Sequence, residues 1–133
     1  MAINNFMIKD FLILNCIGKD DKIGLKVDNK FYIHNLEKKT SNYDQLVLSI
    51  LNLTKKHKVN INNNFSILVN KGPGRYSSLR VSLAVAKGIK ISRKADLFGY
   101  NNSDLGDFRP KNIELLIKKK LLQKNLIKPL YIS

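Results

Sequence analysis

The run Asn70-Lys71-Gly72-Pro73-Gly74 precedes an apolar stretch with helical spacing, a place where phosphate chemistry can occur. Backbone amides at the start of a helix attract anions, which is how phosphate loops work. The spacing argues against this chemistry, because there is no G-x-x-x-x-G-K-[ST] motif and no third glycine three residues after Gly74. The alternative interpretation is that the two glycines allow a tight turn and close packing of a helix on a strand.

The titratable side chains that could support catalysis or metal binding are widely separated. His34 and His57 are 23 residues apart, whereas a zinc protease needs histidines one helical turn apart or a further ligand. Asn15 and Cys16 stand where a ribonuclease H would need a carboxylate for Mg²⁺. Cys16 also lacks the nearby basic pair that would mark a nucleophile. We therefore expect surface histidines, a small buried cysteine, no catalytic residue and no bound metal.

The chain is strongly basic. Lysine and arginine number 24 against 10 acidic residues, a formal charge of +14 over 133 residues. Such an excess predicts a polyanionic partner, most often RNA, DNA or an anionic membrane surface. The alternative is codon bias in an AT-rich gene, since lysine outnumbers arginine by 20 to 4. Codon bias leaves the scarcity of glutamate unexplained, because only Glu37 and Glu114 occur.

The length corresponds to one domain. A sugar kinase or an actin-type ATPase needs a second lobe to close over its nucleotide, and 133 residues are too few for two such lobes. The first apolar run, 11–14, is too short for a signal peptide or a membrane span. A single cysteine excludes an intramolecular disulfide. These features predict a reduced cytoplasmic protein that does not enter a membrane.

Hydrophobic periodicity predicts the elements that must position these residues. A continuous apolar run at 11–14 indicates a strand buried on both faces. Strands near 23–27 and 31–33, joined by the turn Asp28-Asn29, complete an antiparallel meander. A helix from Tyr43, capped by Ser41 or Asn42, has the length of a crossover to a strand parallel to the first. The remaining predictions are a strand at 65–69, a helix at 79–92, a strand at 95–99, a loop at 101–110, and a helix capped by Asn112 that runs to about 124.

The helix predicted over 79–92 is apolar on two sides, whereas a surface helix normally has a single apolar stripe. One side can cover the sheet, so the other predicts a second helix packed there. That helix is either the C-terminal helix of this chain or a helix of a partner. The first stripe comprises Val81, Val85, Gly88 and Ile89, and the second comprises Leu79, Leu83 and Ala86.

Residues 69–88 resemble the hallmark of the TsaB family, also called YeaZ. That hallmark is a strand followed by Gly-Pro-Gly-Ser-Phe-Thr-Gly-Leu-Arg-x-Gly-x-x-x-Ala-Lys-Gly. In this chain 75–78 replaces Ser-Phe-Thr-Gly, with Tyr76 keeping the aromatic ring and Ser77 the hydroxyl. The last residues, 128–133, resemble the family's terminal Pro-x-Tyr-Leu-Arg. The matching residues are Gly72, Pro73, Gly74, Leu79, Arg80, Ala86, Lys87 and Gly88.

The resemblance covers about residues 9–100 and the tail, and the middle of the family's second half is missing. Because the terminal motif is present, we expect a natural internal deletion. The chain is predicted to be a single domain over 1–133, with half of the family's fold over about 9–100 and a basic C-terminal helix and tail over 101–133. Asn15 and Cys16 stand where the family usually has Asp-Thr, and 35–38 replaces a His-Ser-Glu-like run.

The resemblance implies a ribonuclease-H-like (ASKHA) α/β domain, with a three-stranded antiparallel meander, two parallel strands and helices on both faces. It implies a non-catalytic role in forming N6-threonylcarbamoyladenosine at position 37 of tRNAs, as a heterodimer with a TsaD-like protein that a TsaE-like ATPase joins. No cofactor is expected on this chain alone, and any nucleotide is expected at the partner interface. The implied partner contacts are Leu79, Arg80, Ser82, Leu83, Ala86, Lys87 and Lys90, beside the turn motif Gly72, Pro73, Gly74, Arg75 and Tyr76.

Two other hypotheses remain open at this point. One is a stand-alone basic RNA-binding module that keeps only the fold, and the other is a homodimer formed in isolation through the same helix face. The basic tail is a candidate for contacts to a tRNA backbone, which add affinity without sequence choice. Its alternative interpretation is a solvated helix face. The candidate RNA contacts are Arg109, Lys111, Lys118, Lys119, Lys120 and Lys124.

Overall fold

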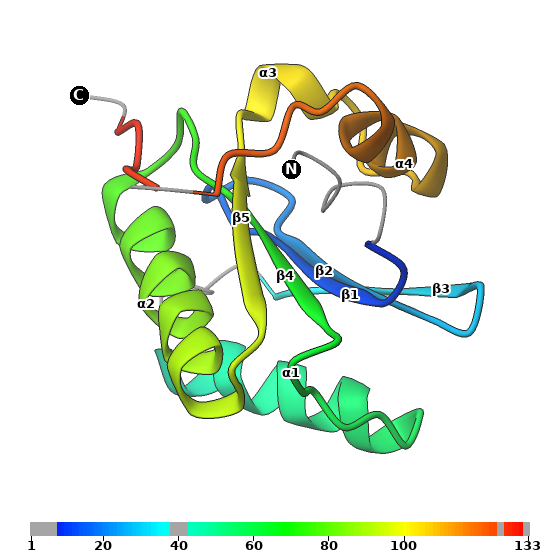
Figure 1. The fold of residues 1–133 in the computed structure, drawn as a ribbon. Coiled ribbons are helices and arrows are strands. Elements are labelled where there is room, and N and C mark those ends of the chain that lie inside the picture. The colour runs from blue at the N-terminus through cyan, green and yellow to red at the C-terminus, as the bar shows by residue number, and fades with distance from the viewer. Residues whose placement is uncertain (1–7, 38–42, 125–126, 132–133) are drawn as a thin grey trace.

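The computed structural model describes residues 8–37, 43–124 and 127–131, which form a five-stranded sheet with helices on both faces (Figure 1). The chain opens with β1 (Phe11–Asn15), β2 (Lys22–Val27) and β3 (Lys30–Asn35). These three strands are the predicted meander. The later elements are α1 (Tyr43–Lys56), β4 (Ser66–Asn70), α2 (Tyr76–Arg93), β5 (Asp96–Tyr100), α3 (Asn102–Leu105) and α4 (Pro110–Lys118).

The strands lie in the spatial order β3-β2-β1-β4-β5. β2 pairs antiparallel with β1 and with β3, whereas β4 lies parallel to β1 and β5 lies parallel to β4. Parallel pairs need long crossover connections, and α1 and α2 provide them. The predicted arrangement of three antiparallel and two parallel strands, with helices on both faces, is therefore confirmed.

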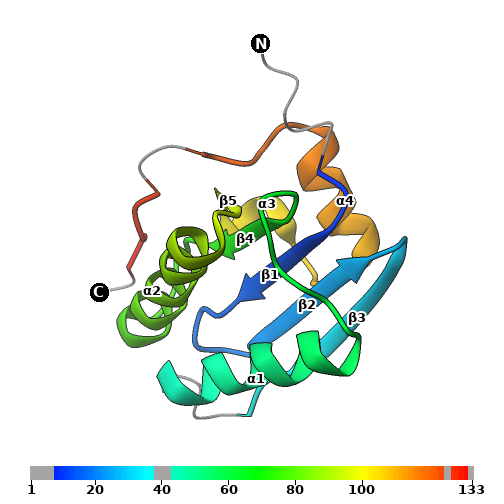
Figure 2. The ribbon, with the colours of Figure 1, turned by 60° about the horizontal axis from the view of Figure 1, so that its bottom comes forward.

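The side chains of β1 alternate between two apolar layers. Leu12 and Leu14 pack in the layer beneath α1 and α2, whereas Phe11 and Ile13 pack in the opposite layer with α3 and α4. All five residues of β1 are buried, as the continuous apolar run predicts for a strand covered on both faces. Figures 1 and 2 show α1 and α2 on one side of the sheet and α4 on the other.

The segment after α4 returns along β5, which lies at the edge of the sheet. The Gly99 amide donates to the Gln123 carbonyl at 2.7 Å, and the Gln123 amide donates back at 2.8 Å. Ile127 is buried against Gly99, which has no side chain to keep it away. An open strand edge is a template for unwanted pairing. This segment therefore satisfies part of that edge within the chain.

Two predictions about the C-terminal third are wrong. The stretch predicted as loop at 101–110 contains the short helix α3. The last helix starts at Pro110, with Arg109 as its N-cap, so Asn112 lies inside it and is not the cap. Proline fits the first helical position because its missing N–H would be unpaired there. The Asn112 side chain instead donates to the Asp107 carbonyl at 2.9 Å, and the helix begins three residues earlier than an Asn112 cap would place it.

The last helix also ends earlier than predicted, at Lys118 and not near 124. Lys120 has a φ of 57°, a left-handed conformation that an α-helix cannot continue. The periodicity of 119–124 was misleading because this segment turns to reach β5. The predicted caps Ser41 and Asn42 lie outside the described residues.

Candidate partner interface

The Gly-Pro-Gly corner joins β4 to α2, and its backbone amides are used within the chain. A phosphate loop would keep such amides available for an anion. The corner instead fastens the start of α2 to the β1–β2 loop and to the C-terminal segment. The three bonds are Gly72 N to Asn70 Oδ1 at 2.9 Å, Gly74 N to the Leu130 carbonyl at 3.0 Å, and Arg75 N to the Ile17 carbonyl at 3.0 Å.

Both glycines of this corner are required by geometry. Gly72 has a φ of +104°, and a Cβ there would lie 2.4 Å from the Leu130 carbonyl oxygen. A Cβ on Gly74 would lie 2.8 Å from the Ile17 Cβ. The motif therefore supports the interpretation of a tight turn with close packing.

α2 begins at Tyr76, three residues before the predicted start, and its first turn carries an aromatic cluster. The Tyr76 ring lies 4.7 Å from the Tyr131 ring, and the Arg80 guanidinium lies 5.8 Å from the Tyr76 ring centre. The side chains of Tyr76 and Tyr131 are about half exposed. The C-terminal segment thus contributes an aromatic ring next to the exposed side of α2.

The structure corrects the expected set of partner contacts on α2. Leu79, Ser82, Leu83 and Ala86 are buried in the chain's own core, so they do not form a surface. The second stripe of α2 is buried and the first is partly covered, because the helix packs against β4 and β5 on one flank and against α1 on another. The second helix is therefore α1, and α4 lies on the far side of the sheet. The predicted contacts that remain exposed are Arg80, Lys87 and Lys90.

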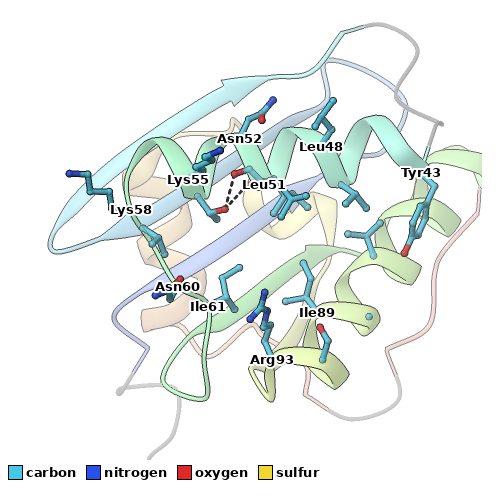
Figure 3. A pocket seen from close by; sticks show the side chains of 17 residues that line it. Tyr43, Leu48, Leu51, Asn52, Lys55, Lys58, Asn60, Ile61, Ile89 and Arg93 are labelled. Carbon is cyan, nitrogen blue, oxygen red and sulfur yellow. Dashed lines mark hydrogen bonds between the residues drawn. The ribbon is translucent and has the colours of Figure 1, made fainter.

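The exposed apolar surface lies instead in a groove between α1 and α2, with a volume of about 960 Å³. Figure 3 shows Leu48 and Leu51 along α1 on one side and Ile89 of α2 on the other. Ile61, in the loop between α1 and β4, also lines the groove. Leu48 is 57% exposed and Leu51 is 55% exposed. We call this feature the α1–α2 groove.

Sequence reasoning missed the α1 side of this groove. The buried residues of α1 are Leu46, Ile50, Leu53 and Thr54, so Leu51 lies outside its buried stripe. A signal was present, because Leu48 and Leu51 widen the apolar stripe beyond what one neighbouring sheet can cover. The same reasoning was applied to α2 alone.

Every charged side chain that lines the α1–α2 groove is a cation. These are Lys55, Lys58 and Arg93, and Figure 3 shows Arg93 beside Ile61 and Ile89. Within the described residues, none of the three has a carboxylate at ion-pair distance. The groove therefore combines an apolar floor with a positive border.

A cluster of polar side chains lies at the carboxyl ends of β1, β4 and β5, and its members hydrogen-bond to one another. Asn15 Oδ1 accepts hydrogen bonds from Asn70 Nδ2 at 2.7 Å and from the Tyr100 hydroxyl at 2.9 Å. Asn70 Nδ2 also donates to Asn102 Oδ1 at 3.0 Å. Asn15 and Asn70 are buried, so these amides satisfy one another. No carboxylate takes part in this cluster, and the described residues contain no group of three or more His, Cys, Asp or Glu placed to hold a metal.

Cys16 follows this cluster and is buried. Burial raises the pKa of its thiol well above the ordinary value, and the nearby Asp21 carboxylate raises it further. Asp21 Oδ1 accepts hydrogen bonds from the amides of Ile17, Gly18 and Lys19 at 2.9 to 3.1 Å. Cys16 is therefore a packed side chain, as predicted, with its thiol held in the unreactive protonated form.

The candidate RNA contacts lie around α4, on the sheet face opposite the α1–α2 groove. Lys111, Lys118 and Lys119 are exposed. Arg109 lies 3.7 Å from the Asp107 carboxylate, and Lys124 lies 3.7 Å from that of Asp96. Lys120 is also exposed and has an interaction within the chain. Only part of the predicted basic set is therefore grouped on one helix.

Comparison with known proteins agrees with this architecture. No family model matches the sequence. The chain is 34% identical over 87 residues to the tRNA threonylcarbamoyladenosine biosynthesis protein TsaB of Buchnera aphidicola subsp. Baizongia pistaciae, a match that covers 64% of this chain and 38% of the relative. The chain thus spans well under half the length of that curated relative.

Solved structures show the same fold. YeaZ from Pseudomonas aeruginosa superposes with a TM-score of 0.64 at 16% identity, covering 74% of this chain and 45% of that one. A second structure, an uncharacterized protein with similarity to peptidase YeaZ from the same organism, gives a TM-score of 0.61 at 16% identity over 74% of this chain and 44% of the other. Fold and site thus define an α/β domain with a five-stranded mixed sheet and a groove between two helices. The sequence match and the fold together make the chain similar to the TsaB and YeaZ proteins.

Among the described residues, no helix combines the length and the apolarity that a membrane span requires.

Proposed function

We propose that this chain is a non-catalytic subunit in the formation of N6-threonylcarbamoyladenosine on tRNA, and that it acts by binding a TsaD-like protein through the α1–α2 groove. The observation that carries the proposal is the pair Leu48 and Leu51, each more than half exposed beside Ile61 and Ile89. A contiguous apolar surface of this kind marks a protein interface. The similarity to the tRNA threonylcarbamoyladenosine biosynthesis protein TsaB of Buchnera aphidicola supplies the biological context.

The non-catalytic part of the proposal is supported by the chemistry at the strand ends. That region carries Asn15, Asn70 and Asn102, whose amides bond to one another. Amides are neutral, so they supply neither the general base nor the anionic metal ligands that hydrolysis or phosphoryl transfer requires. The catalytic groups and any nucleotide are then expected on the partner.

The test combines binding with reconstitution. The purified chain is added, with tRNA and the TsaD-like and TsaE-like proteins of the same organism, to a cell extract from which this chain has been removed, and modified adenosine is measured by mass spectrometry. We expect a stable complex with the TsaD-like protein and formation of modified adenosine only when this chain is present. Leu51→Glu is expected to abolish both, because it places a carboxylate on the apolar floor of the groove.

The matched control is Ile33→Glu. Ile33 is 44% exposed and lies on β3, beside Phe31 in the alternation and so on the α4 side of the sheet. This variant should bind the TsaD-like protein as the wild type does. Failure of the wild-type chain to bind, or equal effects of Leu51→Glu and Ile33→Glu, would refute the proposed interface. Modification of tRNA by the wild-type chain without any TsaD-like protein would refute the non-catalytic role.

The basic helix α4 supports a second candidate function, which is contact with the tRNA backbone. Lys111, Lys118 and Lys119 are exposed there. This contact is compatible with the proposed scaffold role, because α4 and the groove lie on opposite faces of the sheet. A chain that binds tRNA with a steep salt dependence and ignores the TsaD-like protein would instead be a stand-alone RNA-binding module.

A further inference from the structure

The face formed by α1 and α2 differs from the rest of the molecule in the balance of its charges. α2 carries four basic residues and no acidic one over Tyr76–Arg93, and Lys94 follows it. α1 ends in Lys55 and Lys56 and carries Asp44 in its first turn, where Asp44 already has an interaction within the chain. The described part of this face therefore offers cations with almost no carboxylate to balance them.

Elsewhere the chain pairs several of its cations. Lys26 forms an ion pair with Glu114, joining β2 to α4, and Lys124 lies 3.7 Å from the Asp96 carboxylate. Within the described residues, the cations that border the groove have no such pair. Lys55, Lys58 and Arg93 are thus left for whatever occupies the groove.

The occupant must match both the floor and the border of the groove. The apolar side chains of Leu48, Leu51 and Ile89 gain by contact with other apolar atoms, at about 25 cal/mol per Å² removed from water. A sugar-phosphate backbone offers phosphates for the border but little apolar surface for the floor. An amphipathic helix of a protein offers both, with an apolar stripe for the groove and flanking carboxylates for the cations.

A second copy of this chain matches the floor but not the border. Each copy carries a formal charge of +14. Pairing of two copies through this face would bring Lys55, Lys58 and Arg93 of each chain toward cations of the other, and like charges in a closing interface oppose association. The same feature that attracts an acidic partner thus works against self-pairing.

We propose that the α1–α2 groove selects a partner helix whose apolar stripe is bordered by carboxylates, and that its cationic border disfavours a dimer of two copies. The proposal rests on the proposed function, since it describes the surface of the TsaD-like partner that the groove would take. It also predicts the salt dependence of two associations, which the groove alone does not. Salt should weaken the heterodimer and should not weaken self-association.

The first experiment measures both associations at low and high salt. Sedimentation velocity on the chain alone and titration calorimetry with the TsaD-like protein are run at about 50 and about 500 mM NaCl, a range over which the Debye length falls from about 14 to about 4 Å. We expect the affinity for the TsaD-like protein to fall by about tenfold or more. The chain alone should stay monomeric at low salt, and any dimer should increase as salt rises.

The second experiment reverses charge at the border. The double variant Lys55→Glu/Arg93→Glu should bind the TsaD-like protein about tenfold more weakly at low salt and lose most of the salt dependence. The matched control is Lys111→Glu/Lys118→Glu, which changes the net charge by the same amount on the opposite face of the sheet. That control should keep nearly the wild-type affinity.

Each outcome is decisive. If Leu51→Glu abolishes binding but the border variant binds normally, the proposed function stands and the acidic partner is refuted. A low-salt dimer of the wild type that Leu51→Glu breaks would also refute it, as would equal weakening by the border variant and its control. If the border variant loses affinity for tRNA and keeps it for the TsaD-like protein, the border serves RNA. Absence of any wild-type complex with the TsaD-like protein would refute the proposed function itself.

Discussion

The two helical faces of the sheet are both basic, but they differ in how their apolar side chains are covered. On the α4 face, Phe11, Ile13 and Leu68 are fully buried under α3 and α4. On the other face, α1 and α2 lie with a groove between them, and Leu48 and Leu51 remain more than half exposed. The faces therefore share the sign of their charge and differ in their free apolar surface.

This difference shows why net charge is a weak guide to the place of an interface. A charge of +14 attracts polyanions to any part of the surface and acts over a Debye length. Uncovered apolar surface acts only on contact and so specifies one place. The predictions below separate the buried core of α2, the corner that places it, the basic surface of α4 and the two core layers.

The largest expected effect separates buried from exposed leucines. Leu83→Ala on α2 should lower the free energy of unfolding by about 2–5 kcal/mol, because Leu83 is 4% exposed and its loss leaves a cavity. Leu51→Ala on α1, where the side chain is 55% exposed, should change it by less than about 1 kcal/mol. Urea unfolding of the two variants measures both values. Similar losses for both would show that Leu51 is not a surface residue.

A smaller loss is expected at the Gly-Pro-Gly corner. Gly72→Ala should cost about 1–3 kcal/mol, because alanine is strained at a φ of +104° and its Cβ would meet the Leu130 carbonyl. Gly88→Ala is the control, since a Cβ there meets nothing within 4 Å and the residue lies inside α2. That change should stabilise the chain by up to about 1 kcal/mol. If Gly72→Ala leaves the free energy of unfolding unchanged, the C-terminal segment does not contact the Gly-Pro-Gly corner closely.

The features predicted correctly from the sequence depend on local patterns. The apolar run of β1 predicts burial on both faces, and Asp28-Asn29 adopts the positive φ angles of 53° and 65° that a tight hairpin turn needs. The Gly-Pro-Gly motif predicts the corner because only glycine fits at Gly72 and Gly74. Such features are set within a few residues, so a single sequence carries them.

The features that sequence reasoning missed depend on how elements meet. Spacing shows that α2 has two apolar stripes, but it cannot show that α1 packs beside the first one and leaves Leu48 and Leu51 exposed. Which leucine is covered depends on the packing of two helices that are far apart along the chain. The end of α4 was missed for a similar reason, because Gln123 pairs with Gly99 across the fold. The contact set on α2 therefore changed, whereas the helix itself was predicted to within three residues at its start and one at its end.

A third prediction tests the basic surface of α4 against the groove. Lys118→Glu/Lys119→Glu should weaken tRNA binding and lower the slope of log affinity against log salt by up to about two, because two phosphate contacts are lost. Binding to the TsaD-like protein should be unchanged. Fluorescence anisotropy with labelled tRNA over a salt series measures the slope. If Lys55→Glu/Arg93→Glu lowers the slope equally, tRNA binding reflects net charge and not α4.

The smallest effect is a loss of stability at high pH that reports on both core layers. Cys16 lies in the layer under α1 and α2, and Tyr100 lies in the layer under α4. Burial raises the pKa of the Cys16 thiol above its ordinary 9.0, and burial likewise raises the pKa of the Tyr100 hydroxyl above its ordinary 10.0. Below these ordinary values both groups are protonated in the folded and the unfolded chain, so they add no pH dependence.

Above about pH 9 the unfolded chain loses the thiol proton while the folded chain keeps it, so the free energy of unfolding should fall as the pH rises. The slope from one such group approaches about 1.4 kcal/mol per pH unit only well above the unfolded pKa. Cys16→Ala should remove the part of the slope that begins near 9, and Tyr100→Phe the part that begins near 10. Urea unfolding between pH 7 and about 10.5 separates them. A Cys16→Ala slope equal to that of the wild type would show that the thiol ionises as readily in the folded chain as in the unfolded chain. The core layer beneath the groove would then admit water, unlike the layer beneath α4.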